Sequence, residues 1–349
     1  MLFRKFSQHM NYFLLILISL ACGLSACAPE ENVVTPNQDV WTLFSIPTNQ
    51  NAVYSDKVSG TTLSNKKKIF EANTGIQKVF IYRDQIYVLM PDAKSIKILN
   101  RSNYAEIHTI DFSMLQKKPI SMAFGNATTG YVIFENDSIV MLYDILNKKL
   151  AGTISVGTNT VDIITGSGDR QNQLFVANLG SNTISHIDTR TNKVEKQYSV
   201  LAAPRFLSND PTGTKVVYVS EGAGKSIGGA SRSTPGIGFI DIDRKVLLGQ
   251  MTISTRDIDS SDAIPTGLTV TANEWAFVTL SNGLVRVDTR EYKTYSTISK
   301  NIYSGIIYND RRREVLAIYG DEIHVLNDNS GLVQRILQTN QQLKFIYPQ

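Results

Sequence analysis

The sequence contains few of the residues that form metal sites and nucleophilic active sites. Of its 349 residues, two are cysteine and four are histidine, and both cysteines, Cys22 and Cys27, precede residue 28. A domain that begins after them has no disulfide, no zinc-thiolate site and no cysteine nucleophile. The string G-x-S-x-G occurs at Gly224 to Gly228, but in a Gly- and Ser-rich stretch without the helix that follows a nucleophile elbow, and no pair of carboxylates lies within an apolar run. We therefore favour a non-catalytic role and keep an enzyme as the alternative.

The chain also has no large excess of positive or negative charge. The formal net charge is +4, and basic residues do not gather along one stretch of the chain. We therefore expect no nucleic-acid partner. The basic cluster Arg311 to Arg313 follows Asn309-Asp310, and we interpret it as a solvated turn between two strands rather than a phosphate site.

A leader is indicated at the N-terminus. Arg4 and Lys5 precede a short apolar run from Tyr12 to Leu20, which is typical of a secretory signal rather than of a lasting membrane span. The run ends in Leu24-Ser25-Ala26-Cys27, which resembles the bacterial lipobox. This resemblance implies that Cys27 is lipidated and becomes the mature N-terminus. Cys22 fits the same pattern less well.

The residues after Cys27 suggest a location in the cell envelope. Ala28, where some lipoproteins carry an aspartate, argues against retention in the inner membrane, so we expect an outer-membrane lipoprotein. Glu30-Glu31 resembles an acidic pair that directs some lipoproteins to the cell surface. Periplasmic and surface-exposed locations both stay open. Residues 27–39 are polar and contain two prolines, as expected for a flexible tether.

A repeat without helices occupies most of the chain. In its clearest copy, Leu174 to Ala177 is an apolar strand, and a turn rich in Asn and Gly leads into the alternating strand Thr183 to Asp188. The turn 189–192 then leads into a more polar strand, Val194 to Val200. The small apolar segment Val161 to Thr165 precedes them and suits the crowded innermost position of a blade. Four such strands make one propeller blade.

An Asp or Asn closes the third strand of each copy, where its side chain can hydrogen-bond the backbone of the next turn. These markers recur about every 44 residues, which is a blade-sized period. They predict an all-β, seven-bladed β-propeller of four-stranded antiparallel blades. The markers are Asn65, Asn100, Asp144, Asp188, Asp241, Asp288 and Asn327.

Closure of the ring is expected to involve the last strand. Leu343 to Tyr347 resembles the inner strand Lys78 to Tyr82, and no second strand follows it. We expect this segment to complete the first blade and remove its exposed edge. Val40 to Ile46 is the competing candidate for that inner strand. The expected division is a signal peptide over 1–26, the tether over 27–39 and the propeller over 40–349.

The copy FVANLGSNTISHIDTRTNKV, residues 175–194, resembles the repeat of the YVTN family of β-propellers. Ala177, Asn178, Asp188 and Asn192 are among its matching positions, whereas His186 departs from the pattern. The resemblance implies the propeller fold over roughly residues 50–347. It says little about function, because such propellers have many unrelated roles.

The connections of two blades are unusually long. Glu221 to Gly236 lies within the fifth blade, and Ser254 to Pro265 leads into the sixth. Connections of these two kinds emerge on the same face of a propeller, so we expect ligand binding there. The candidate ligand-binding residues are the charged members of these loops: Lys225, Arg232, Arg256, Asp257, Asp259 and Asp262.

Two patterns in these loops resemble known sites but depart from them. Gly222 to Ser226 lacks the glycine spacing and the helix of a phosphate loop, so we expect no nucleotide there. Asp257 to Asp262 begins like a calcium loop, but Asp262 stands in place of the required glycine and Leu268 in place of the final glutamate. A solvated acidic loop is the favoured interpretation, and a weak calcium site stays open.

Three functional hypotheses remain. The leading one is a lipid-anchored extracytoplasmic propeller that binds a ligand or an envelope protein on the face of blades 5 and 6. A variant, implied by resemblance to surface lipoproteins, captures a cobamide or another nutrient for a TonB-dependent transporter. The alternative is a lactonase-like or quinoprotein-like enzyme with a metal or quinone at the propeller axis, so the cofactor is unknown.

Overall fold

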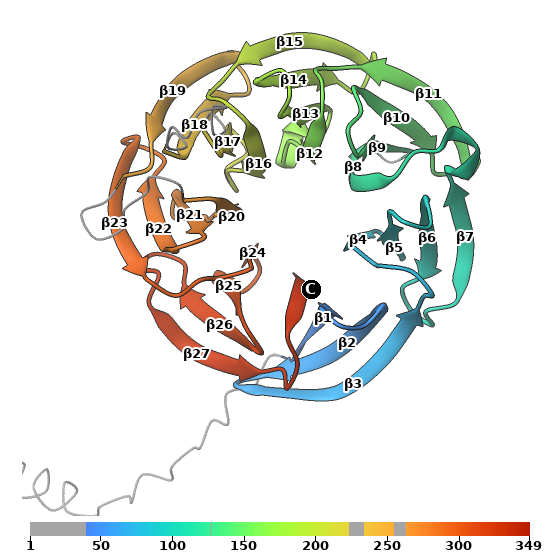
Figure 1. Cartoon of the computed structure of the whole chain (residues 1–349), viewed down its shortest axis with the longest axis horizontal. Coiled ribbons are helices and arrows are strands. Elements are labelled where there is room, and N and C mark those ends of the chain that lie inside the picture. Colours follow the sequence, from blue (N-terminus) through green and yellow to red (C-terminus); the bar gives the residue numbers. More distant parts are fainter. Residues whose placement is uncertain (1–39, 127, 223–233, 255–262) are drawn as a thin grey trace, which may run out of the picture. The chain divides into compact units, whose positions relative to one another are not determined.

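The computed structural model describes residues 40–126, 128–222, 234–254 and 263–349. These residues form seven sheets of four antiparallel strands, which stand as blades around a common axis (Figure 1). The seven-bladed β-propeller expected from the sequence is confirmed. We number the blades in chain order and give the strands of each blade from the innermost to the outermost.

The first four blades contain the following strands. Blade 1 contains β28 (Leu343–Pro348), β1 (Trp41–Pro47), β2 (Ala52–Ser59) and β3 (Thr62–Glu71). Blade 2 contains β4 (Lys78–Tyr82), β5 (Gln85–Met90), β6 (Ser95–Asn100) and β7 (Glu106–Asp111). Blade 3 contains β8 (Pro119–Asn126), β9 (Thr129–Phe134), β10 (Ile139–Asp144) and β11 (Lys149–Ser155). Blade 4 contains β12 (Thr160–Thr165), β13 (Gln173–Asn178), β14 (Thr183–Asp188) and β15 (Lys193–Ser199).

The other three blades and two short helical turns complete the described structure. Blade 5 contains β16 (Pro204–Asn209), β17 (Lys215–Ser220), β18 (Gly236–Asp241) and β19 (Val246–Thr252). Blade 6 contains β20 (Pro265–Val270), β21 (Trp275–Leu280), β22 (Gly283–Asp288) and β23 (Lys293–Ser299). Blade 7 contains β24 (Gly305–Asn309), β25 (Glu314–Tyr319), β26 (Glu322–Asn327) and β27 (Val333–Gln338). The 3₁₀ turns are η1 (Ser113–Leu115) and η2 (Gly168–Arg170).

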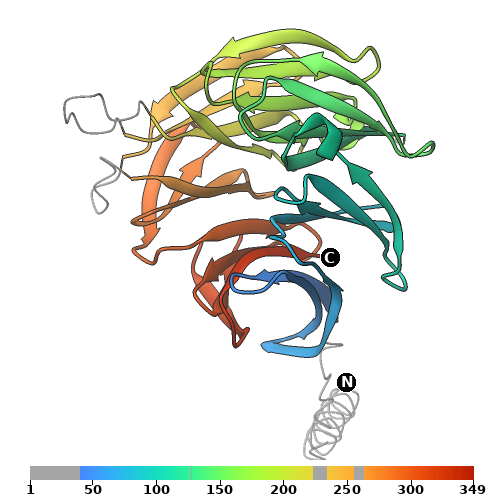
Figure 2. The same cartoon turned by 45° about the vertical axis from the view of Figure 1, so that its right-hand side comes forward.

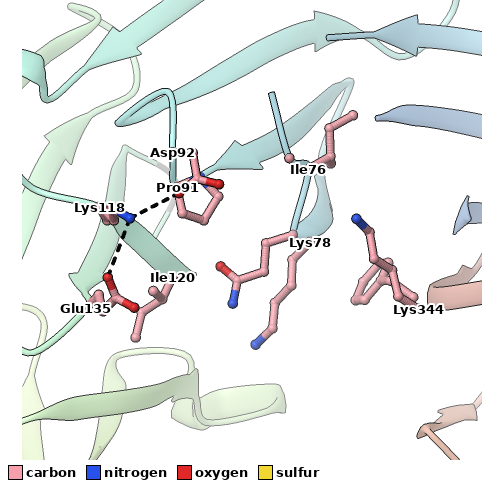
Figure 3. Close-up of a pocket in the computed structure, with 11 residues that line it drawn as sticks. Ile76, Lys78, Pro91, Asp92, Lys118, Ile120, Glu135 and Lys344 are labelled. Carbon is pink, nitrogen blue, oxygen red and sulfur yellow. Dashed lines mark hydrogen bonds and ion pairs between the residues drawn. The ribbon is translucent and has the colours of Figure 1, made fainter. Parts of the chain in front are cut away.

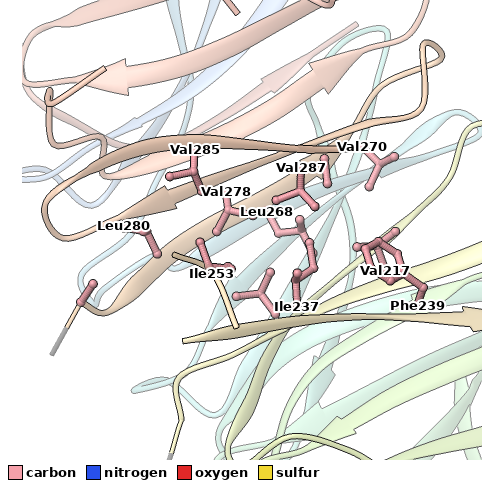
Figure 4. Packing of buried hydrophobic residues seen from close by; sticks show 13 residues of the cluster. Val217, Ile237, Phe239, Ile253, Leu268, Val270, Val278, Leu280, Val285 and Val287 are labelled. Carbon is pink, nitrogen blue, oxygen red and sulfur yellow. The ribbon is translucent and has the colours of Figure 1, made fainter. Parts of the chain in front are cut away.

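The hydrophobic core is divided into layers between neighbouring blades. Second strands such as β13 are buried along almost their whole length, because both faces of each blade are covered by the adjacent blades. Outer strands such as β11 are mostly exposed. Figure 4 shows the layer between blades 5 and 6, where Phe239 and Ile253 meet Leu268 and Val285. Packing between sheets therefore fixes the inner strands firmly in place.

The marker rule holds in six of the seven blades among the described residues. Each of these six side chains ends a third strand, and one of its oxygens accepts backbone N–H groups of the next turn, as Asp188 Oδ1 does from Arg190 N at 2.8 Å. This turn explains why Asp and Asn recur at the position. The same geometry occurs at Asn100, Asp144, Asp241, Asp288 and Asn327.

The marker proposed for blade 1 is wrong. Asn65 lies within the outer strand β3, whereas the third strand, β2, ends at Ser59. Pairing between β2 and β3 shifts register around Asn65, whose φ of 55° places it in the left-handed region. Asn favours this backbone conformation as well as the Asx turn, so the residue type alone did not distinguish a bulge from a strand end. Gly60, with φ 58°, forms the turn that follows β2.

Ring closure follows the expected route. β28 is the inner strand of blade 1 and pairs with β1, with Phe44 opposite Tyr347. The competing candidate, Val40 to Ile46, corresponds to β1 and is the second strand instead. Blade 1 therefore combines one strand that follows blade 7 with three strands that precede blade 2. Strand β28 covers the inner edge of β1, which would otherwise be exposed.

Candidate functional site

The two kinds of connection divide the ring into two faces. The long-loop face consists of the connections between second and third strands and those between blades, and the short-turn face consists of the remaining connections. The two long connections approach each other on the long-loop face, because Ile253 N donates a hydrogen bond to Pro235 O at 2.8 Å. Figure 2 shows the blades obliquely.

All sequence-predicted site residues lie outside the part of the chain that the structure describes. This applies to the lipidation site, Cys27, and to every nominated loop residue. The structure therefore places none of them relative to the others. The nominated loop residues are Lys225, Arg232, Arg256, Asp257, Asp259 and Asp262.

A cavity opens on the long-loop face at the inner ends of blades 1, 2 and 3. Its volume is about 490 Å³, and it is lined by the connection before β4, the turn after β5 and the ends of β8, β9 and β28 (Figure 3). Three lysines line it, each from a different blade: Lys78, Lys118 and Lys344. The apolar part of the wall includes Ile120 and Phe345.

Lys118 is neutralised within this cavity. Its Nζ lies 3.0 Å from Asp92 Oδ1 and 3.9 Å from Glu135 Oε2, as the dashed lines in Figure 3 indicate. The hydrogen bond to Asp92 raises the pKa of Lys118, with a further contribution from the charges of both carboxylates. The two acids of the cavity wall therefore face the same lysine.

Lys78 and Lys344 are placed differently. Lys78 is the first residue of β4, and its Nζ reaches Asp162 Oδ1 only at 4.0 Å. Lys344, the second residue of β28, is partly buried, and this desolvation lowers the pKa of its ammonium group. Within the described residues, no carboxylate lies within 4 Å of Lys344 Nζ. The cavity thus contains ammonium charge that its own acids do not neutralise.

A second cavity of about 280 Å³ adjoins the first and shares Lys78 and Glu135 with it. Asp162, on β12, lines this second cavity with its side chain 14 % exposed. Its carboxylate accepts hydrogen bonds from Leu207 N at 2.9 Å and from Ile163 N at 3.0 Å. Burial raises the pKa of Asp162, and the charge of Lys78 and these hydrogen bonds oppose that effect. Asp162 therefore holds two backbone segments in place.

The buried histidines serve the packing of single blades. His186 Nε2 lies 2.5 Å from Gln173 Oε1, and its Nδ1 lies 3.3 Å from the Tyr198 hydroxyl. His324 Nδ1 lies 3.1 Å from the Tyr303 hydroxyl. Both histidines are buried and hydrogen-bonded within their own blades. Over residues 40–126, 128–222, 234–254 and 263–349, no group of three or more His, Cys, Asp or Glu residues could hold a metal ion.

The short-turn face has a cavity of another character. Arg83, Arg101 and Arg311 line a hollow of about 350 Å³ beside the end of β28. The neighbouring Arg313, by contrast, pairs with Asp328 at 3.3 Å. Arg311 and Arg313 are exposed, as expected for a solvated turn. Asp310 also lines this hollow, and the Arg101 guanidinium donates a hydrogen bond to Arg83 O at 3.2 Å. We therefore take the larger long-loop cavity as the better candidate for a ligand.

Sequence reasoning missed the lysines of the long-loop cavity. The signal available was weak, since Lys78 and Lys344 each lie in a strand already assigned to the inner position, where small apolar residues were expected. Each lysine of the cavity comes from a different blade. The sequence of a single repeat therefore does not show that the three side chains meet.

Comparisons with known proteins support the β-propeller fold but indicate no particular family or function. No family model matches the sequence, and no curated protein matches it either. Among solved structures, a chain in a crystal structure of the mitotic checkpoint complex is 11 % identical, with a TM-score of 0.61, over 79 % of this chain and 81 % of that one. Hydrazine synthase of Kuenenia stuttgartiensis is 10 % identical, with a TM-score of 0.60, over 86 % of this chain and 95 % of that one.

At these identities the likeness extends to the β-propeller fold alone. The structure adds one negative finding: none of the described residues belongs to a helix with the length and apolarity that crossing a membrane requires. The chain thus shares its architecture with proteins of unrelated roles, and its function has to be argued from its own site.

Proposed function

We propose that the protein is a lipid-anchored extracytoplasmic propeller of the YVTN kind that binds a ligand or partner protein on its long-loop face and catalyses no reaction. The main support for this proposal is the lysine-lined cavity on that face. Its volume of about 490 Å³ lies within the usual range of small-molecule sites. A β-propeller fold is consistent with binding, and the cavity supplies a place for it.

The scaffold supports binding because it holds the cavity walls rigidly. Inner strands β4, β8 and β28 are fixed by the packed layers between blades, so the side chains that project from them are positioned before a ligand arrives. The connections 221–235 and 253–264 are long, and by the order of the strands they belong to the same face as the cavity. Long connections on a rigid scaffold are common places for recognition.

The proposed location rests on the leader pattern. The apolar run Tyr12 to Leu20 and the lipobox-like Leu24 to Cys27 support lipidation, and Ala28 supports the outer membrane. A tether after Cys27 gives the propeller reach from the membrane surface. The partner is then an envelope protein or a transporter, and the ligand is a solute of the periplasm or the cell exterior.

The anchor is tested with the full chain in a Gram-negative host. Envelope fractionation and labelling with a radioactive fatty acid are compared for the wild type, Cys27→Ala and the matched control Cys22→Ala. We expect label and envelope association in the wild type and in C22A, and loss of the label in C27A. Equal labelling of C27A and the wild type would refute lipidation at Cys27.

Binding is tested by native mass spectrometry of the full chain in detergent, purified directly from the host envelope. A retained small molecule or a co-purified envelope protein supports the proposal and identifies the class of partner. A retained metal or quinone together with turnover of a substrate contradicts it and favours the enzyme alternative. A protein that retains nothing and co-purifies with nothing also contradicts it.

A further inference from the structure

Two ammonium groups of the long-loop cavity come from neighbouring inner strands. β28 and β4 belong to blades 1 and 2, and both contribute a lysine near the long-loop end of the strand. Both side chains line the cavity in Figure 3, with their ammonium groups pointing in different directions; Asp162, which lies 4.0 Å from Lys78 Nζ, is not drawn there. A ligand that fills the cavity can contact both side chains.

The acids of the cavity do not balance these charges. Asp92 and Glu135 both face Lys118, at 3.0 and 3.9 Å. Asp162 lies 4.0 Å from Lys78 Nζ, beyond the distance of a good hydrogen bond, and its oxygens accept backbone N–H groups. Lys344 is partly desolvated and, among the described residues, has no carboxylate within 4 Å of its ammonium group; this is unfavourable, and a bound anion relieves that cost. The same anion gives Lys78 a closer counterion than Asp162.

The remaining wall of the cavity is partly apolar. Ile76 is buried at its base, and Ile120 and Phe345 are partly buried around it. Aliphatic and aromatic groups beside a cation suit a ligand that has an apolar body and a charged end. A bare inorganic ion leaves this part of the wall without a partner.

We propose that Lys78 and Lys344 together bind the carboxylate or phosphate group of a small amphipathic solute, whose apolar part lies against Ile120 and Phe345. This inference rests on the proposed binding function and specifies the chemical class of its ligand. Lys118, which is already neutralised by Asp92 and Glu135, shapes the wall and contributes no further charge to the anion.

Calorimetric titration of the full chain in detergent tests the site, with benzoate as the carboxylate probe and phenyl phosphate as the phosphate probe, because each has an apolar ring and one anionic group. The variants are Lys78→Met, Lys344→Met and the double variant, and the control is Lys293→Met, whose side chain is 68 % exposed on β23. We expect the dissociation constant of the better probe to rise about tenfold in each single variant. Binding is lost in the double variant and unchanged in K293M.

The better of the two probes identifies the anionic group. Equal affinity of the double variant and the wild type, or an equal loss in K293M, overturns the proposal, as does the absence of binding of either probe to the wild type.

A second measurement uses the wild-type protein alone, so that folding of the variants does not matter. Lysines are acetylated with acetic anhydride in the presence and absence of the better probe, and the sites are quantified by mass spectrometry. We expect protection of Lys78 and Lys344 at least several-fold greater than that of Lys293. Equal protection of all three contradicts the site.

The lysine site and the proposed binding function can be contradicted independently of each other. If the natural ligand retained in native mass spectrometry is uncharged, or stays bound to the double variant, the lysine site is wrong and the binding function stands. If the wild type retains nothing from the envelope and yet binds a probe through these lysines, the site stands and the proposed function is wrong.

Discussion

Blades 4 and 1 have the same four-stranded plan but differ in how the chain builds them. Blade 4 is one continuous segment, with each strand after its neighbour and a marker, Asp188, at the end of its third strand. Blade 1 takes its inner strand from after blade 7 and has Gly60 at the corresponding turn. The regular sequence of blade 4 makes the propeller fold recognisable. Blade 1, which departs from the repeat, contributes Lys344 to the candidate site.

The least regular blade thus contributes one lysine to the site, whereas Lys78 and Lys118 come from blades 2 and 3, which follow the marker rule. Blade 1 departs from the rules at its turn, in its outer strand and in its connectivity. Its inner strand borders the cavity. Changes in the two blades, ordered from the largest expected effect to the smallest, test this contrast.

Removal of the closing strand is expected to have the largest effect. Deletion of residues 343–349 exposes the inner edge of β1 and removes the buried Leu343 and Ile346. We expect loss of the cooperative unfolding transition in urea, followed by circular dichroism. The single change Ile346→Ala is expected to cost about 3 kcal/mol, similar to Ile163→Ala in blade 4. A deletion variant as stable as the wild type would contradict the role of β28.

The second prediction concerns pH and blade 4. Burial lowers the pKa of His186 to about 4 from its ordinary 6.5, so the folded protein binds this proton less readily than the unfolded chain. The stabilising contribution of neutral His186 is complete above pH 6.5 and is lost as the pH falls from 6.5 toward 4. We expect the free energy of unfolding to drop by about 3 kcal/mol across this window from this residue.

Urea titrations at several pH values measure this effect. In His186→Gln, which keeps polar atoms near Gln173 and Tyr198, the additional slope between pH 6.5 and 4 should disappear. His108→Gln, on the outer strand β7, serves as the control and should leave the slope unchanged. An identical slope in H186Q and the wild type would show that His186 does not titrate in this range.

The third prediction compares the contributions of Asp188 and Asn65 to stability. In Asp188→Ala, the turn after β14 loses the acceptor for Arg190 N, and the Arg190 guanidinium loses its carboxylate partner at 2.6 Å. We expect a cost of about 2 kcal/mol in urea unfolding. Asn65→Gly in blade 1 should change stability by less than about 0.5 kcal/mol, because glycine also adopts the left-handed conformation of this bulge. Similar losses at both positions would mean that Asn65 caps a turn after all.

The smallest effect on stability is expected at Lys344. Lys344→Met removes a partly buried charge without a close counterion, so the free energy of unfolding should stay within about 0.5 kcal/mol of the wild type or rise slightly. Anion binding, in contrast, should weaken. Because burial lowers the pKa of Lys344, binding to the wild type should decline with rising pH sooner than an ordinary lysine allows. A pH-independent dissociation constant across the alkaline range would contradict this.

Much of the fold could be predicted because local chemistry repeats. Asp and Asn at strand ends bond the next turn in six blades, so six strand boundaries follow from side-chain chemistry alone. Asn65 failed because a left-handed bulge and an Asx turn favour the same residue. The segment Leu343 to Tyr347 was recognised through its likeness to another inner strand.

The candidate site could not be predicted in the same way. Lys78, Lys118 and Lys344 come from three blades, and their relation depends on how far each sheet extends toward the axis. The sequence directed attention to the long connections of blades 5 and 6, whose nominated residues lie outside the described residues, whereas the cavity lies at blades 1, 2 and 3. Contacts between blades, such as the ion pair of Lys118 with Asp92, decide which lysines have a carboxylate partner. The sequence of a single repeat does not predict these contacts.

The late position of β28 in the chain also has a consequence for biogenesis. During synthesis, β1 to β3 emerge before the other described strands, and the inner edge of β1 has no partner strand until every other blade has been made. A hydrophobic strand edge left open for that long is prone to pair with other chains. Folding helpers that shield such edges would therefore matter most for the earliest strands, and the yield of native protein would depend on how quickly the last strand of the ring is delivered.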